Sequence, residues 1–305
     1  MLSFNMNIPK QLAIIGATAS GKSSLSLELA KKQNGIILSL DSLSVYKEIN
    51  IASAKPTEEE RKGILHFGID EIYPNEPFDV TIFIKLYEKA LNFAKQNDKN
   101  LIIVGGSSFY LKTLIYGISN LPNISQQTKE KTAEFLTNKQ DAYDFINAID
   151  PTYMSKIKPN DSYRIEKALN IYFETDTKPS AYFEVNPPMP IITEPLPIYE
   201  IKIPREELRD RIKRRTLKMI EDGLIDEIKM LETTYSREPN PMKAIGIKET
   251  LDFIDRKISK DELIELISTH TAQLAKRQTT FNRTQFKDKT IITNNEIEVF
   301  EDFLN

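Results

Sequence analysis

The sequence predicts an α/β protein with a parallel sheet core and a mostly helical insertion domain. Three observations support this fold class. Short apolar runs alternate with helical patterns, the first run leads into a glycine-rich motif, and strand signals stop in the middle of the chain. With 305 residues, 40% hydrophobic and 28% charged, the chain is long enough for a substantial core and for about two domains.

The first part of the chain alternates strands with helices. Residues 12–15, 36–40 and 101–104 are apolar runs of the length expected for strands that are buried on both faces. Between them, residues 22–33 and 83–95 place apolar side chains at helical spacing. This order predicts parallel strands that are joined by right-handed crossovers.

The middle of the chain predicts helices without strands. Helical patterns cover residues 128–137, 141–148 and 162–175, and the segment that follows, 179–197, contains six prolines. Because proline is excluded from helix interiors and central strands, we expect this segment to be an extended return to the sheet.

The rest of the chain predicts one more strand and long helices. These cover residues 198–203, 205–235, 241–255 and 260–283. We therefore predict two domains, which are a core domain of residues 1–117 and 198–305 with its C-terminal helices, and a helical insertion domain of residues 118–197.

Composition limits the chemistry of the protein. The chain has no cysteine, which excludes disulfides and thiolate metal sites, and it has only two histidines. A bound metal would therefore be an oxygen-liganded ion such as Mg²⁺. No apolar run reaches the ~20 residues that a membrane helix needs, and residues 1–23 lack a cleavage signal. We expect a cytoplasmic monomer with no membrane contact.

Positive charge is concentrated in two segments although the net charge is −3. Residues 202–218 hold eight basic and three acidic side chains, and residues 270–289 hold five basic and one acidic. An acidic protein can therefore present a local positive surface to nucleic acid. Ordinary solvated helix faces are the alternative reading.

A phosphate-binding loop is predicted at residues 16–23, which match G-x-x-x-x-G-K-[ST] between a buried strand and an amphipathic helix. This motif makes the core P-loop NTPase-like. Its backbone N–H groups and the helix N-terminus would bind a diphosphate, Lys22 would reach the outer phosphate, and Ser23 would bind Mg²⁺. The predicted binding residues are Gly16, Ala17, Thr18, Ala19, Ser20, Gly21, Lys22 and Ser23. The motif leaves open whether the diphosphate belongs to a nucleotide such as ATP.

Asp41 is the one carboxylate that we expect at a strand end. The run at 101–104 ends in Gly105-Gly106, where a P-loop NTPase usually has an acid, whereas Asp41 follows the run at 36–40. Strand ends surround the ligand crevice in such sheets, so Asp41 should face the P-loop and could remove a proton from a nucleophile. It could instead cap the turn that follows it.

Seven motifs together resemble the bacterial tRNA dimethylallyltransferase family, also called tRNA isopentenyltransferases. They are GATASGKS, DSLSVY, SAKP, VGGSSFYLK, RIKRR, AIGIKE and QLAKRQTTFNR, and they extend from the first strand to about residue 283. The resemblance implies transfer of a dimethylallyl group from dimethylallyl diphosphate to N6 of adenosine 37, the residue 3′ of the tRNA anticodon, with release of diphosphate. It also implies that Asp41 is the general base and that Arg215 stabilises the departing diphosphate beside Lys22.

The resemblance further implies contacts with the anticodon stem-loop, and Ser107 takes the place of a family threonine. The matching positions are Asp41, Ser42, Leu43, Ser44, Ser107, Lys129, Tyr163, Arg164, Ile165, Glu166, Lys167, Lys243, Lys248, Lys276 and Arg277. The chain departs from the family at Ala17, which replaces a proline, at Ile247, which replaces an aromatic residue, and at Phe281, which replaces a tryptophan. We therefore assign no base-stacking role to Ile247 or Phe281.

Three alternatives share the P-loop. A small-molecule kinase would need a lid with arginines and has no use for the LAKRQ motif. An adenylate prenyltransferase would use AMP as acceptor and would not require the basic C-terminal half. A nucleotide-switched RNA-binding module is disfavoured by the missing second acid.

Overall fold

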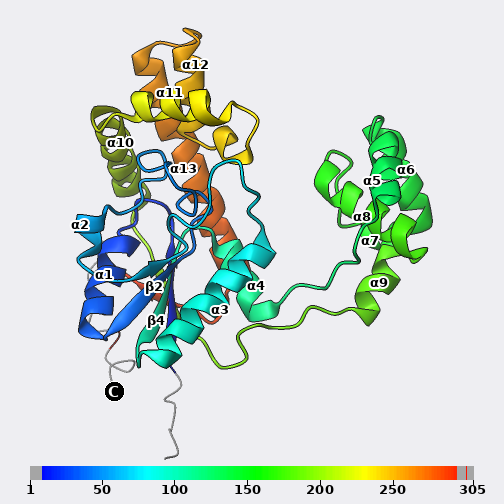
Figure 1. The fold of residues 1–305 in the computed structure, drawn as a ribbon, viewed down its shortest axis with the longest axis horizontal. Coiled ribbons are helices and arrows are strands. Elements are labelled where there is room, and N and C mark those ends of the chain that lie inside the picture. The colour runs from blue at the N-terminus through cyan, green and yellow to red at the C-terminus, as the bar shows by residue number, and fades with distance from the viewer. Residues whose placement is uncertain (1–8, 294–299, 301–305) are drawn as a thin grey trace, which may run out of the picture. The chain divides into compact units, whose positions relative to one another are not determined.

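The computed structural model describes residues 9–293 and Phe300 (Figure 1). The chain divides into two compact units, which we call the sheet unit (Met1–Leu114 with Ile192–Asn305) and the helical unit (Ile115–Ile191). The chain leaves the sheet unit and returns to it at one place, where the N–H of Ile192 donates to the carbonyl of Leu114 at 2.9 Å. The helical unit is therefore an insertion.

The sheet unit contains a six-stranded parallel sheet in the order β3-β2-β4-β1-β5-β6. The strands are β1 (Gln11–Gly16), β2 (Gly35–Ser39), β3 (His66–Phe67), β4 (Asn100–Gly105), β5 (Ile198–Ile201) and β6 (Thr290–Ile292). The central strand β1 has four consecutive apolar residues with no exposed surface, since helices cover both of its faces. The predicted parallel core is confirmed, while the short β3 and β6 were not predicted.

Helices α1 and α3 lie on opposite sides of β2 and β4 (Figure 1), α10 to α12 gather beyond the carboxyl ends of the strands, and the long α13 runs from there down along the sheet. The helices of this part are α1 (Lys22–Lys32), α2 (Glu58–Arg61), α3 (Val80–Gln96), α4 (Ser108–Tyr116), α10 (Arg205–Glu221), α11 (Leu224–Tyr235), η1 (Asn240–Lys243), α12 (Ile247–Ile254) and α13 (Lys260–Gln285). The single helix predicted over 205–235 is two helices, because Gly223 adopts φ +101° and turns the chain between them. Among the described residues, no helix is long and apolar enough to cross a membrane.

The helical unit has its own core, which includes Ile146, Met154, Ile165 and Leu169. Its helices are α5 (Gln126–Phe135), α6 (Lys139–Ile149), α7 (Pro151–Met154), α8 (Ser162–Thr175) and α9 (Pro179–Val185). The extended conformation predicted for 179–197 is wrong over its first seven residues. Pro179 occupies the first position of α9, where its missing N–H removes no helical hydrogen bond.

Candidate active site

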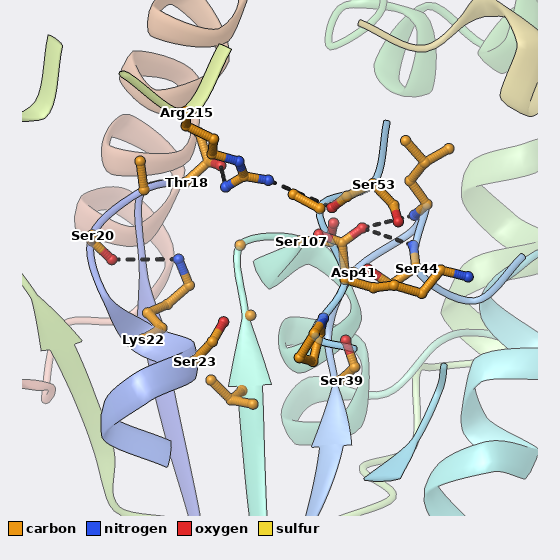
Figure 2. A pocket seen from close by; sticks show the side chains of 18 of the residues that line it. Thr18, Ser20, Lys22, Ser23, Ser39, Asp41, Ser44, Ser53, Ser107 and Arg215 are labelled. Carbon is orange, nitrogen blue, oxygen red and sulfur yellow. Dashed lines mark hydrogen bonds between the residues drawn. The ribbon is translucent and has the colours of Figure 1, made fainter. Parts of the chain in front are cut away.

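A pocket of about 530 Å³ lies at the carboxyl ends of β1, β2 and β4, entirely within the sheet unit (Figure 2). The P-loop follows β1, Asp41 follows β2, and Gly105 to Ser107 lie at the end of β4, while α10, α13 and the loop at residues 52–56 contribute much of the remaining wall. Predicted residues from three separate motifs are thus brought to one edge of the sheet, as expected for a parallel α/β fold.

Residues 18–23 of the P-loop line the pocket, whereas Gly16 and Ala17 do not. Gly16 ends β1, and Ala17 is buried against Ile212 of α10 and Ala275 of α13. Ala19 has φ +62°, a left-handed conformation that is uncommon for a residue with a side chain and that curls the loop around the pocket.

Lys22 folds back over the loop and is 8% exposed. Its Nζ donates to the carbonyl of Ala17 at 2.6 Å and to Oγ of Ser20 at 3.4 Å. Burial lowers the pKa of Lys22 to about 7, with Arg215 adding to the decrease and Asp41 opposing it. A bound anion would therefore restore the full positive charge of this side chain.

Arg215 connects the P-loop to the loop after β2 from its position on α10 (Figure 2). Its Nη1 donates to Oγ1 of Thr18 at 3.2 Å, and its Nη2 donates to the carbonyl of Ser53 at 3.5 Å. Burial lowers the pKa of Arg215, whereas the negative charge of Asp41 raises it. Lys22 and Arg215 thus bring two basic side chains to the pocket beside the P-loop.

The two oxygens of Asp41 have different surroundings. Oδ1 accepts the backbone N–H groups of Leu43 at 2.8 Å and Ser44 at 3.2 Å, so the residue does cap the following turn. Oδ2 has no hydrogen-bond partner among the described residues, and Asp41 lines the pocket. One oxygen therefore holds the carboxylate in place while the other is available to a ligand.

A second strand-end carboxylate, Asp70, lies three residues past β3 and corrects the expectation that Asp41 is alone. Asp70 forms ion pairs with Lys55 and Arg61, and Nζ of Lys55 also donates to the carbonyl of Tyr46 at 2.8 Å. Asp70 does not line the pocket. Its charge is neutralised by its partners, which leaves Asp41 as the carboxylate that faces the P-loop.

Two side chains that shape the pocket were not predicted. Glu227 of α11 accepts the N–H groups of three successive residues, 50–52, at 2.8–2.9 Å and so fixes the loop that Arg215 contacts. Gln278 of α13 accepts the N–H of Thr18 at 2.8 Å. Gln278 is the last residue of the LAKRQ motif, for which the sequence predicts no role at the P-loop, and nothing in the sequence signalled Glu227.

The predicted tRNA contacts are divided between the units. Those of the sheet unit either line the pocket or are exposed on neighbouring helices. Asp41, Ser42, Leu43, Ser44 and Ser107 line it, and Lys243, Lys248, Lys276 and Arg277 are exposed on η1, α12 and α13. Oγ of Ser107 accepts the N–H of Ser42 at 3.4 Å, which joins two of these segments.

In the helical unit, Lys129 is exposed on α5, and Tyr163 and Arg164 are exposed at the start of α8. Glu166 and Lys167 are partly buried, and Nζ of Lys167 lies 5.4 Å from the ring centre of Tyr163. Ile165 has no exposed surface and packs in the core of the unit, so its side chain serves packing.

The two family departures at aromatic positions have different surroundings. Ile247 has no exposed surface, so it fills the core at the start of α12. Phe281 is partly buried and lies edge-on to Phe286, with the ring centres 6.4 Å apart.

Comparisons with known proteins agree with this site. The family model described as IPP transferase matches residues 44–285. A tRNA dimethylallyltransferase from a Sulfurovum species is 58% identical over 92% of this chain and 94% of the relative's own length. A tRNA dimethylallyltransferase from Sulfurimonas denitrificans is 55% identical over 90% of this chain and 93% of that relative's length.

Solved structures of tRNA-modifying prenyltransferases are similar to this chain as well. The tRNA isopentenylpyrophosphate transferase of Bacillus halodurans aligns with 97% of this chain and 94% of its own, at 30% identity and a TM-score of 0.69. A eukaryotic dimethylallyltransferase acting on tRNA aligns with 96% of this chain and 76% of its own, at 28% identity and a TM-score of 0.83. With its P-loop pocket, its motifs and these matches over nine-tenths of its length, the chain belongs to the IPP transferase family.

Proposed function

We propose that this protein transfers the dimethylallyl group of dimethylallyl diphosphate to N6 of adenosine 37 in tRNA, giving N6-(dimethylallyl)adenosine and diphosphate. One observation carries the proposal. A single pocket places the cationic groups of Lys22 and Arg215 beside the P-loop, with the unpaired carboxylate oxygen of Asp41 across from them. These groups match a leaving anion and a proton acceptor.

In this reaction a C–N bond forms between the prenyl carbon and N6, and the C–O bond to the diphosphate breaks. Asp41 accepts the proton that N6 loses. Negative charge grows on the departing diphosphate, where the P-loop amides, Lys22 and Arg215 stabilise it. An exocyclic aromatic amine is a weak nucleophile, so holding both substrates in a partly closed pocket contributes much of the rate.

Mg²⁺ would assist by neutralising charge on the diphosphate oxygens. Within residues 9–293 and Phe300, no three Asp, Glu, His or Cys side chains form a metal cluster, but Mg²⁺ bound through phosphates needs only one or two protein oxygens. Ser23 is exposed at the start of α1 and lines the pocket. Its hydroxyl would hold the ion.

The acceptor is the anticodon stem-loop of tRNA. Reaching Asp41 requires the target adenosine to leave its stack, as it does in other base-modifying enzymes. Exposed cationic side chains at Lys243, Lys248, Lys276 and Arg277 of the sheet unit, and at Lys129 of the helical unit, suit contacts with RNA phosphates. The protein would work as a cytoplasmic monomer.

The test supplies labelled dimethylallyl diphosphate and Mg²⁺ with either total tRNA or AMP as the acceptor. A separate reaction supplies ATP and a hydroxyl-bearing small molecule, in order to detect kinase activity. We expect label in tRNA at adenosine 37 and an equal amount of released diphosphate. Label in AMP would instead support an adenylate prenyltransferase. ATP hydrolysis that Lys22→Ala abolishes, without label in tRNA, would support the kinase.

A further inference from the structure

Two adjacent glycines at the end of β4 are required for different reasons. A Cβ at Gly105 would lie 2.6 Å from the backbone oxygen of Leu40, which cannot move without moving β2. At Gly106 the three nearest atoms to such a Cβ all belong to the Gln278 side chain, with Nε2 at 2.4 Å. An alanine at position 106 would therefore have to displace the side chain of Gln278, which comes from a distant helix.

The same side chain holds the P-loop. Oε1 of Gln278 accepts the N–H of Thr18 at 2.8 Å, across 260 residues of sequence. The hydroxyl of Thr18 accepts from Arg215 at 3.2 Å. Thr18 is thus held from α13 through its backbone and from α10 through its side chain, and its N–H is directed to Gln278.

Helix α13 contacts the P-loop at a second point, one turn before Gln278. Ala275, one turn earlier on α13, packs with Ile212 against Ala17 of the loop. Helix α13 therefore holds the P-loop both through a packed methyl group and through a hydrogen bond.

We propose that Gln278 is a positioning residue that sets the P-loop at Thr18 for diphosphate binding, and that Gly106 is glycine in order to admit it. The proposal rests on the proposed function in taking a diphosphate as the ligand. It joins two family motifs, the double glycine and LAKRQ, in one physical contact.

A double-mutant cycle tests this contact, with inorganic pyrophosphate and Mg²⁺ as the probe in titration calorimetry. Gln278→Ala should weaken pyrophosphate binding about 5- to 10-fold, as loss of one hydrogen bond does. Gly106→Ala should weaken it at least as much, because its methyl group displaces the Gln278 amide. The double variant should bind no worse than Gln278→Ala alone, since the new methyl group enters the vacated space. Losses that multiply in the double variant would overturn the proposal.

Gly105→Ala is the matched control, because its clash is with the backbone of Leu40. Gln278→Ala should not rescue its folding or its pyrophosphate affinity. If Gln278→Ala rescued both Gly105→Ala and Gly106→Ala, its effect would be a general loosening of the packing around the pocket, and this result would also overturn the proposal. In turnover, Gln278→Ala should raise KM for dimethylallyl diphosphate, and its melting temperature should fall by no more than the few degrees that loss of one hydrogen bond costs. The calorimetric cycle needs no tRNA, so a wild-type protein that fails to modify tRNA would refute the proposed function alone.

Discussion

Replacing Asp41 by Asn separates its two roles. An asparagine side chain keeps the oxygen that accepts the N–H groups of Leu43 and Ser44, so the turn and the fold should persist. It cannot accept the proton of the nucleophile, so kcat should fall by about 10²–10⁴, the range for loss of a general base. The affinity for dimethylallyl diphosphate should not fall, because the substitution removes a negative charge that repels the negatively charged diphosphate. Single-turnover assays with tRNA measure the chemical step directly.

Asp41→Ala is the matched comparison, because alanine loses the cap as well. Loss of a cap costs about 1 kcal/mol, which lowers Tm by about 2–4 °C in a domain of this size. We therefore expect equal losses of kcat in the two variants and a lower Tm in the alanine variant alone. An asparagine variant that keeps more than a tenth of the wild-type turnover would refute the general-base assignment and leave Asp41 as a turn cap.

Three further predictions concern charge. Arg215→Lys keeps a cation but cannot span both loops that Arg215 contacts, so kcat should fall about 10- to 100-fold while tRNA affinity, measured by filter binding, stays constant. The variant with Lys276→Ala and Arg277→Ala should bind tRNA more weakly, and its log–log salt slope should be shallower by about 2; an unchanged slope would mean that both are solvated surface charges. In the free protein the pKa of Lys22 is about 7, and bound diphosphate raises it, so binding takes up a proton above pH 7. Above pH 7 the free enzyme has a neutral Lys22, so affinity for dimethylallyl diphosphate should fall by up to about tenfold per pH unit. Below pH 7 Lys22 is already charged, so its ionisation should not affect the affinity. Calorimetry in buffers of different ionisation enthalpy measures this uptake, which Lys22→Arg should abolish.

Local patterns were sufficient to predict the catalytic edge of the sheet. The apolar runs at 12–15 and 101–104 have the length and composition of strands buried on both faces, and parallel strands place their carboxyl ends together. The sequence therefore predicts that the P-loop and Asp41 lie at the same edge of the sheet. The structure confirms the parallel sheet and brings both into one pocket.

Other features depend on tertiary contacts that leave no periodic signal. Strand β3 has two residues and is held by pairing with β2, so its sequence cannot indicate it. The contact of Gln278 with Thr18 spans 260 residues. The prolines around α9 predict an extended segment, whereas Pro179 is favourable at the first position of the helix, where its missing N–H has no helical partner to lose.

The adjoining ends of the insertion make the protein modular. Leu114 and Ile192 are hydrogen-bonded to each other, so a short linker could replace everything between them without moving either end. Every described residue that lines the catalytic pocket comes from the sheet unit. An inserted domain can therefore be exchanged for another, by evolution or by an engineer, without rebuilding the machinery that cleaves the diphosphate ester.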